Sequence, residues 1–289
     1  MNFTGSMCAI VTPFKDEKVD AQALQRLIDF QIDNGTSALV PCGTTGESAT
    51  LTHEEHHQVI ELTIKFSGGR VPVIAGTGSN ATAEAISLTR EAKKWGADAA
   101  LLITPYYNKP TQEGLYAHYM AVADAVEIPQ ILYNVPARTA VSINPETVAR
   151  LAQHPNIVAI KEASGSMDYV SQLRGLSSIT ILSGNDNLTL PLMALGATGS
   201  ISVLANVIPK LCAQMIAAVD AGEWATARQI HYSTFGLTEA LFLETNPIPV
   251  KAALAMMGLI SDEIRLPLVT MNEKFAPRLR KELEALDLL

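Results

Sequence analysis

The chain has 289 residues, of which 48% are hydrophobic and 17% charged, and its formal net charge is −8 at pH 7. This length and composition suit a large core in one domain, or in one domain with an appendage, and show no signature of disorder. The acidic balance offers no basic surface to a nucleic acid. The chain shows no signal-peptide pattern and no run of roughly 18 consecutive apolar residues, so neither secretion nor membrane insertion is expected.

Short apolar runs recur along the chain, and each is followed by a loop and then by an amphipathic segment. The sequence predicts eight strands from these runs: Met7–Phe14, Ala38–Gly43, Val71–Gly76, Ala99–Thr104, Gln130–Val135, Ile157–Ala163, Ile179–Ser183 and Gly199–Ala205. Helices are predicted between them, at Ala21–Asn34, Thr52–Phe66, Thr82–Trp95, Gln112–Val126, Pro145–Gln153, Tyr169–Leu176 and Leu188–Leu195. Apolar strands that alternate with helices indicate a parallel sheet covered on both faces. Eight such units favour an α/β fold of the (β/α)8 TIM barrel type, with an open doubly wound sheet as the alternative.

The strand pattern stops after Ala205, and helical patterns occupy the rest of the chain to Leu289. We therefore expect a catalytic barrel over residues 1–224 and a C-terminal helical region over residues 225–289. The pattern assigns no role to the stretch Asn246–Lys251 within that region.

A lone lysine, Lys161, interrupts the apolar strand predicted at Ile157–Ala163. Alternate side chains of a strand share a face, so Lys161 should share its face with Ile157, Ala159 and Ala163, opposite Val158, Ile160 and Glu162. Burial disfavours the ammonium form, and a fall of about three units in its pKa would yield a usable amine nucleophile. This placement favours Schiff-base chemistry with a carbonyl substrate. The alternatives are a lysine paired with a carboxylate across the sheet, or one that reaches solvent from the strand end.

Polar residues follow several of the predicted strands, where the reactive groups of such barrels lie. The glycine-rich loop Gly43–Ser48 offers backbone N–H groups and the hydroxyl of Thr44. Tyr133 ends the fifth strand, so Thr44, Tyr133 and Lys161 are expected to converge. A phenol is a suitable proton carrier beside an amine, and Arg138 can bind a carboxylate through two hydrogen bonds. Taken singly, each could also be an ordinary core tyrosine or surface arginine.

Two further patterns resemble known motifs but occur in the wrong context. The string His53–His57 fits the HExxH zinc motif, but Thr52 and Glu55 predict a capping box that places it in a first helical turn, so no metal is expected. Gly76–Ala81 resembles a dinucleotide fingerprint, which requires an acidic residue at the end of the next strand. Asp98 precedes that strand instead, so nucleotide binding is not favoured.

The three cysteines, Cys8, Cys42 and Cys212, are widely spaced and lie in apolar runs. Their odd number and their setting indicate reduced core thiols, not disulfides or metal ligands. A cytoplasmic enzyme fits these features.

The ordered set GTTGE, TPYYNKPTQEG, YNVPART, IKEASG and SGND makes nearly the whole chain resemble the dihydrodipicolinate synthase family of class I aldolases. The resemblance implies a (β/α)8 lyase that condenses pyruvate with L-aspartate 4-semialdehyde to 4-hydroxy-tetrahydrodipicolinate, the first committed step toward lysine and diaminopimelate. It implies no metal and no organic cofactor.

The same resemblance assigns roles to individual residues. Lys161 would form the Schiff base with pyruvate, and Tyr133, Thr44 and Tyr107 would relay protons. In the family Tyr107 reaches the site of a neighbouring subunit, which implies a homodimer and commonly a homotetramer. Substrate contacts would come from Thr45, Arg138, Ile201 and Gly184.

A second, regulatory site is also implied. His53 and His56 share one helix face and Asn80 and Glu84 another, and the set matches the pocket in which feedback-regulated members bind L-lysine. The full set is Ser48, Ala49, His53, His56, Asn80, Glu84 and Tyr106. Ordinary polarity of helix faces is the alternative interpretation.

Two positions depart from the family pattern, in which a glycine commonly precedes the arginine and an aspartate often follows the glycine. Ala137 and Asn185 occupy these positions, so binding of the semialdehyde is less secure than pyruvate chemistry. The alternatives are N-acetylneuraminate lyase, a 2-keto-3-deoxy sugar acid aldolase, or a lysine sensor without catalytic activity.

Overall fold

The computed structural model describes residues 3–289, so Met1 and Asn2, at the start of the expected barrel, lie outside the described residues. Its main sheet consists of eight parallel strands: β1 (Gly5–Cys8), β4 (Ala38–Leu39), β5 (Ile74–Gly76), β6 (Ala99–Ile103), β7 (Gln130–Asn134), β8 (Ile157–Glu162), β9 (Thr180–Ser183) and β10 (Gly199–Ser202). Their spatial order is β4, β1, β10, β9, β8, β7, β6, β5, and the parallel bridge between Leu39 and Val73 joins the two ends. The sheet is thus a closed barrel, which confirms the predicted fold class.

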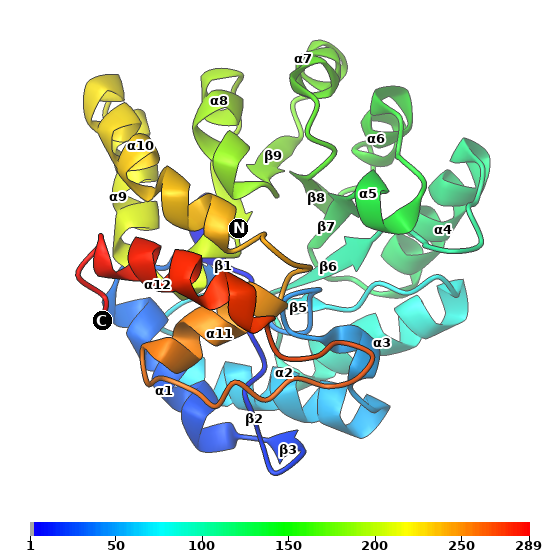
Figure 1. The fold of residues 1–289 in the computed structure, drawn as a ribbon. Coiled ribbons are helices and arrows are strands. Elements are labelled where there is room, and N and C mark those ends of the chain that lie inside the picture. Colours follow the sequence, from blue (N-terminus) through cyan, green and yellow to red (C-terminus); the bar gives the residue numbers. More distant parts are fainter. Residues whose placement is uncertain (1–2) are drawn as a thin grey trace.

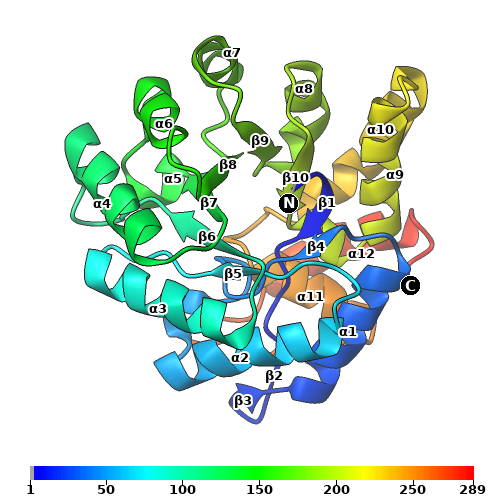
Figure 2. The ribbon, with the colours of Figure 1, turned by 180° about the vertical axis from the view of Figure 1, so that it is seen from behind.

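Helices surround this barrel (Figures 1 and 2). The ring comprises α1 (Ala21–Asp33), α2 (His53–Ser67), α3 (Thr82–Trp95), α4 (Gln112–Ala125), α6 (Pro145–Leu151), α7 (Met167–Leu176), α8 (Thr189–Ala194) and α9 (Pro209–Asp220). Local signals define their ends: the Asp20 side chain caps α1, and Gly68 ends α2 at a positive φ of 58°. Among residues 3–289, no helix has both the length and the apolar character that crossing a bilayer requires.

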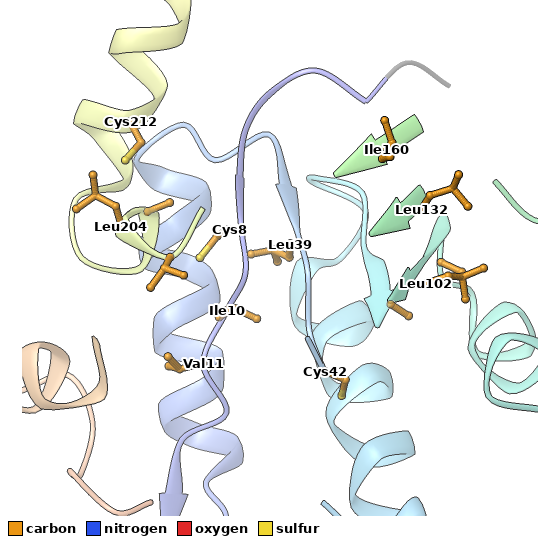
Figure 3. Close-up of a cluster of buried hydrophobic side chains, with 14 of the residues drawn as sticks. Cys8, Ile10, Val11, Leu39, Cys42, Leu102, Leu132, Ile160, Leu204 and Cys212 are labelled. Atoms are coloured by element: carbon orange, nitrogen blue, oxygen red, sulfur yellow. The ribbon is translucent and has the colours of Figure 1, made fainter. Parts of the chain in front are cut away.

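The strands divide the core into an inner and an outer layer. Inside the barrel lie alternate residues of the strands, including Met7, Leu101, Ala159, Leu182 and Ile201. Outside it, the opposite faces pack against the helices, as Figure 3 shows for Leu102, Leu132 and Ile160. This two-layer core gives the apolar strands of the sequence their buried surroundings on both faces.

Lys161 belongs to the inner face together with Ala159 and Ala163, as the alternation predicts. The prediction was wrong for the start of the strand, where Ile157 lies in the outer cluster and Val158 packs against the inner one. The cause is an irregularity in the pairing of β7 with β8, where Gln130 pairs with Ile157 but Ile131 with Ala159. One extra residue shifts the alternation by one position.

The three cysteines are free and buried, as expected. Cys8 on β1 and Cys212 on α9 lie near each other with Leu204 in the outer layer (Figure 3). Burial raises the pKa of all three thiols, which keeps them protonated.

The predicted first strand was too long. β1 ends at Cys8, although the N–H groups of Ala9 and Ile10 still donate to the backbone oxygens of Ser202 and Val40. The next N–H, that of Val11, donates instead to the side chain of Asn206 at 3.1 Å. Besides the 3-10 helices, the hairpin strands β2 (Phe14–Lys15) and β3 (Lys18–Val19) and the helix α5 (Pro136–Thr139) were not predicted.

The C-terminal part contains α10 (Trp224–Ala240), α11 (Ile248–Met256) and α12 (Ala276–Glu284). In Figure 1 the last two lie across the front of the ring. Between α11 and α12, residues 257–272 are largely non-helical, since Gly258 turns the chain at a φ of 71° and Pro267 disfavours helix.

Candidate active site

Lys161 lies near the C-terminal end of β8 and is 5% exposed. It is paired in register with Tyr133 of β7, so that both side chains leave their strands on the same face. Lys161 Nζ lies 4.3 Å from the centroid of the Tyr133 ring. Among residues 3–289, no carboxylate forms an ion pair with Lys161, which removes the paired-lysine alternative.

Gly184 gives Lys161 room to extend. A Cβ atom at position 184 would lie 2.7 Å from Ala163 Cβ and 3.0 Å from Lys161 Cε. Any larger residue would therefore displace the lysine side chain.

The loop after β4 brings two hydroxyl groups to the same cavity. Thr44 lines it, and Thr45 Oγ1 accepts a hydrogen bond of 3.0 Å from Asn246 Nδ2. The backbone oxygen of Asn246 in turn accepts a hydrogen bond of 3.2 Å from Arg138. Asn246 thus connects the threonine loop with the arginine, and its Oδ1 has no hydrogen-bond partner within the described part of the chain.

The cavity around the lysine has a volume of about 70 Å³. It is a few times the space needed for one water, so it suits a compound of a few heavy atoms. Six of the predicted catalytic and substrate-binding residues line it: Thr44, Thr45, Tyr133, Arg138, Lys161 and Gly184. Two predicted residues lie elsewhere. Ile201 is fully buried inside the barrel, and Tyr107 is 90% exposed.

Two carboxylates lie near the lysine strand: Glu162 belongs to β8 itself, and Asp186 follows β9. Glu162 accepts hydrogen bonds from Asn134 Nδ2 and from the Ser164 N–H, and burial raises its pKa. Asp186 accepts hydrogen bonds from the N–H groups of Val203 and Leu204. Burial also raises the pKa of Asp186, whereas the positive charge of Lys161 acts to lower it.

The residues of the predicted second site come together in part. His53 Nε2 on α2 lies 3.4 Å from Glu84 Oε1 on α3, and the Ser79 hydroxyl donates to the other Glu84 oxygen. Asn80 Nδ2 donates to the backbone oxygen of Tyr106 at 3.2 Å. The His53 and Glu84 side chains are 66% and 41% exposed, so this cluster is open.

Three other members of the set have different surroundings. Ser48 and Ala49 lie in the short 3-10 helix Ser48–Thr50, between the loop Gly43–Glu47 and α2. His56 is buried, and its Nε2 lies 2.8 Å from the Gly76 oxygen. Burial lowers the pKa of His56 to about 4, so its ring is neutral at pH 7.

The capping box that we predicted at the start of α2 is present, with hydrogen bonds in both directions between Thr52 and Glu55. Glu55 also forms a two-pronged ion pair with Arg265, with both hydrogen bonds at 2.6 Å. Glu55, which directly follows the glutamate of the HExxH string, Glu54, thus has a structural partner in the C-terminal part of the chain.

A buried amine beside a phenol, in a small cavity at the C-terminal ends of barrel strands, defines a lyase of the class I aldolase type. The profile of the dihydrodipicolinate synthetase family matches residues 2–286. The chain belongs to this family.

Individual proteins agree with this assignment. The chain is 60% identical over 273 residues to 4-hydroxy-tetrahydrodipicolinate synthase of Geobacter sulfurreducens, which covers 94% of each chain. It also resembles the crystal structure of chloride-inhibited dihydrodipicolinate synthase from Acinetobacter baumannii complexed with pyruvate, at 48% identity and a TM-score of 0.97 over 100% of both chains. The lysine-bound enzyme of Cyanidioschyzon merolae is 41% identical, with a TM-score of 0.97 over 99% of both chains.

Several residues of the site were missed in the sequence. Phe242 and Asn246, from the segment between α10 and α11, line the cavity around Lys161, as does Val203. Asn185, noted in the sequence for its departure from the family pattern, lines it too. The sequence did contain one signal close to this segment: a single charged residue, Lys251, interrupts the apolar helix α11 that follows it.

Proposed function

We propose that the chain condenses pyruvate with L-aspartate 4-semialdehyde to give 4-hydroxy-tetrahydrodipicolinate, through a Schiff base on Lys161. The observation that carries this proposal is the enclosed Lys161 amine over the Tyr133 ring, in a cavity of about 70 Å³. The name of the relative from Geobacter sulfurreducens and the pyruvate complex of the Acinetobacter baumannii enzyme support the reaction and its first substrate.

In the first half of the reaction, the neutral amine of Lys161 attacks the ketone carbon of pyruvate. The carbinolamine that results loses water to form a protonated imine, and Tyr133 donates and accepts the protons with Thr44. Loss of a methyl proton then gives the enamine. The imine itself is the electron sink, so the chemistry requires no external cofactor.

In the second half, the enamine carbon attacks the aldehyde carbon of the semialdehyde. The amino group of the semialdehyde then closes the ring at the imine carbon and releases Lys161. Arg138, which lines the cavity, is proposed to bind the carboxylate of this substrate. Thr45, Gly184 and the backbone near Ile201 are proposed to hold the pyruvate end, and Val203 supports this since it lines the cavity two residues beyond Ile201.

We further propose that L-lysine inhibits the enzyme at the cluster of Ser48, Ala49, His53, His56, Asn80, Glu84 and Tyr106. The exposed carboxylate of Glu84 suits the ammonium group of an amino acid, and the lysine-bound relative from Cyanidioschyzon merolae supports this ligand. Burial raises the pKa of Tyr106, and the charge on Glu84 raises it further. Glu84 therefore acts electrostatically on Tyr106, which directly precedes Tyr107 in the chain.

The proposed assembly is a homodimer, paired into a homotetramer. The 90% exposure of the Tyr107 side chain supports this assembly. As a member of the proposed proton relay, Tyr107 would reach the cavity of a neighbouring subunit. We also propose a barrel of residues 1–224 with a helical region of residues 225–289, and a cytoplasmic location that the free, buried cysteines support.

The test is to incubate the protein with pyruvate and sodium borohydride and to locate the added mass by peptide mass spectrometry. A reduced pyruvate adduct on Lys161, absent from Lys161→Ala, is the expected result. Condensation activity is then measured with the semialdehyde, and N-acetylneuraminate and 2-keto-3-deoxygluconate serve as competing substrates. A folded protein without an adduct would contradict the proposal and favour a lysine sensor.

A further inference from the structure

The C-terminal helical region contacts the catalytic loop through a buried ion pair. Lys251 Nζ on α11 lies 2.5 Å from Glu47 Oε1, and each side chain is 1% exposed. Glu47 is the last residue of the string GTTGE, three positions after Thr44. The pair is therefore both fully enclosed and adjacent to a proposed catalytic hydroxyl.

Burial of two charges is costly unless each finds partners. Burial lowers the pKa of Lys251, and the Glu47 carboxylate opposes this effect. The Lys251 ammonium also lies 4.3 Å from the centroid of the Phe14 ring, and the other Glu47 oxygen accepts a 3.1 Å hydrogen bond from the Arg265 N–H. The surroundings thus hold Glu47 in one place from two sides.

The backbone conformation of Glu47 requires contacts that fix this residue. Its φ is 54°, in the left-handed region that a residue with a side chain rarely adopts. This conformation persists only where neighbouring contacts determine it. The adjacent residues are fixed as well: the Gly46 oxygen accepts a 2.7 Å hydrogen bond from Thr12, and Thr45 is bonded to Asn246.

We propose that Glu47 and Lys251 are positioning residues for the condensation: their ion pair fixes the loop so that the Thr44 and Thr45 hydroxyls face Lys161. This inference rests on the proposed Schiff-base function. It also gives the C-terminal helical region a part in catalysis, although the only residues of that region that line the cavity are Phe242 and Asn246.

A purely structural role would be served as well by two neutral residues, because replacing a buried ion pair with neutral groups of similar volume is often without cost to stability. The test therefore uses the double variant Glu47→Gln with Lys251→Met, which keeps the volume of both side chains. The two single variants complete a double-mutant cycle. Melting temperature, kcat, KM for each substrate and the rate of borohydride trapping on Lys161 are measured for all of them.

We expect the folded double variant to lose roughly tenfold to a hundredfold in kcat and in trapping rate, the range that follows from a shift of about 1 Å in a catalytic group. KM for the semialdehyde should change less, since Arg138 is not moved. A double variant with native melting temperature and wild-type kinetics would overturn the inference. The matched control is Glu113→Gln, which removes a carboxylate from Arg150, a cation that likewise lies over an aromatic ring, that of Tyr116. It should leave the kinetics unchanged.

If the double variant does not fold, the positioning role is tested with Glu47→Asp instead. This variant keeps both charges and shortens only the reach of the carboxylate. A slower trapping rate supports positioning, and a wild-type rate contradicts it. In every series, borohydride trapping of pyruvate on Lys161 is first measured with the wild-type protein. Absence of an adduct there would refute the proposed function, whereas a normal wild type with normal variants refutes only the positioning role.

Discussion

The two polar clusters on either side of the segment Gly43–Thr50 differ in their exposure. On one side Lys161 is 5% exposed and lies over the ring of Tyr133. On the other side the His53 and Glu84 side chains are 66% and 41% exposed. Both clusters lie at the C-terminal ends of parallel strands or in the helices that follow such strands, so the fold alone does not explain the difference.

The comparison shows what each cluster can do by itself. The Lys161 amine is enclosed by residues of one chain, beside the ring of Tyr133. An exposed carboxylate binds an amino acid weakly, because water competes for each hydrogen bond and screens the charge. The proposed L-lysine cluster is thus open to solvent, whereas the cavity around Lys161 is lined by residues of one chain.

The largest effect is expected from Lys161→Ala. Loss of the nucleophile should lower kcat/KM by more than about a thousandfold and abolish the borohydride adduct. Lys210→Ala, on the exposed side of α9, is the control and should behave like the wild type. Residual adduct on the Lys161 variant would place the nucleophile elsewhere.

Tyr133→Phe tests the phenol apart from its ring. The ring that lies 4.3 Å from Lys161 Nζ is retained, so only the proton carrier is lost. We expect kcat to fall roughly 10²- to 10⁴-fold, the usual contribution of a general acid or base. Binding of pyruvate, measured by calorimetry, should change little, and a wild-type kcat would assign the proton transfer to another group.

Arg138→Ala should affect the two substrates differently. Loss of a charge-assisted contact of about 1.5 to 3 kcal/mol should lower kcat/KM for the semialdehyde roughly tenfold to a hundredfold. Trapping of pyruvate on Lys161 should stay close to the wild-type rate. Equal losses in both measurements would show that the arginine acts on the whole cavity.

Glu84→Gln addresses the open cluster. It removes the charge that faces His53, so the concentration of L-lysine needed for half inhibition should rise about tenfold while uninhibited kcat is unchanged. Glu91→Gln, two turns further along α3, is the matched control. Unchanged inhibition in the Glu84 variant would remove this carboxylate from the lysine site.

The smallest effect concerns stability toward acid. His118 is buried, its Nε2 has no partner among residues 3–289, and burial lowers its pKa to about 4. The unfolded chain binds this proton near pH 6.5, so stability from the neutral ring is complete above that pH and is lost as pH falls toward 4. The loss is on the order of 2 to 3 kcal/mol.

The measurement is urea unfolding at a series of pH values between 7 and 4. His118→Asn should unfold with a shallower pH dependence over this window than the wild type, whatever its stability at pH 7. His231, which is less buried, provides the comparison variant His231→Asn. Parallel pH profiles for the wild type and His118→Asn would contradict the assignment.

Periodicity sufficed for the order of strands and helices, because apolar runs and caps are local properties of the chain. Periodicity predicted the wrong strand end or the wrong face where the backbone bonds to residues that are distant in the sequence. Backbone pairing of the first run does not extend to Phe14, since the Val11 N–H bonds to the Asn206 side chain, and the faces of Ile157 and Val158 are exchanged by the irregular pairing with β7. Neither partner can be identified from the neighbouring sequence.

For the site, the strand ends indicated Lys161, Tyr133 and Thr44, since barrel geometry brings strand ends together whatever the loops do. Phe242 and Asn246 were missed because they follow a helix nearly 80 residues after β8, outside any strand–loop pattern. The exposed setting of Tyr107 was likewise outside the reach of local pattern, because exposure depends on what the remaining chain covers.

The sequence by itself determined the barrel, the buried lysine and the phenol beside it, because these depend on strand periodicity and on a fixed relation between neighbouring parallel strands. Only the tertiary structure decided how the catalytic loop is held. Glu47 and Lys251 are 204 positions apart, and Thr45 and Asn246 are 201 apart. Burial makes these contacts strong and specific, and burial is a property of the whole packed chain.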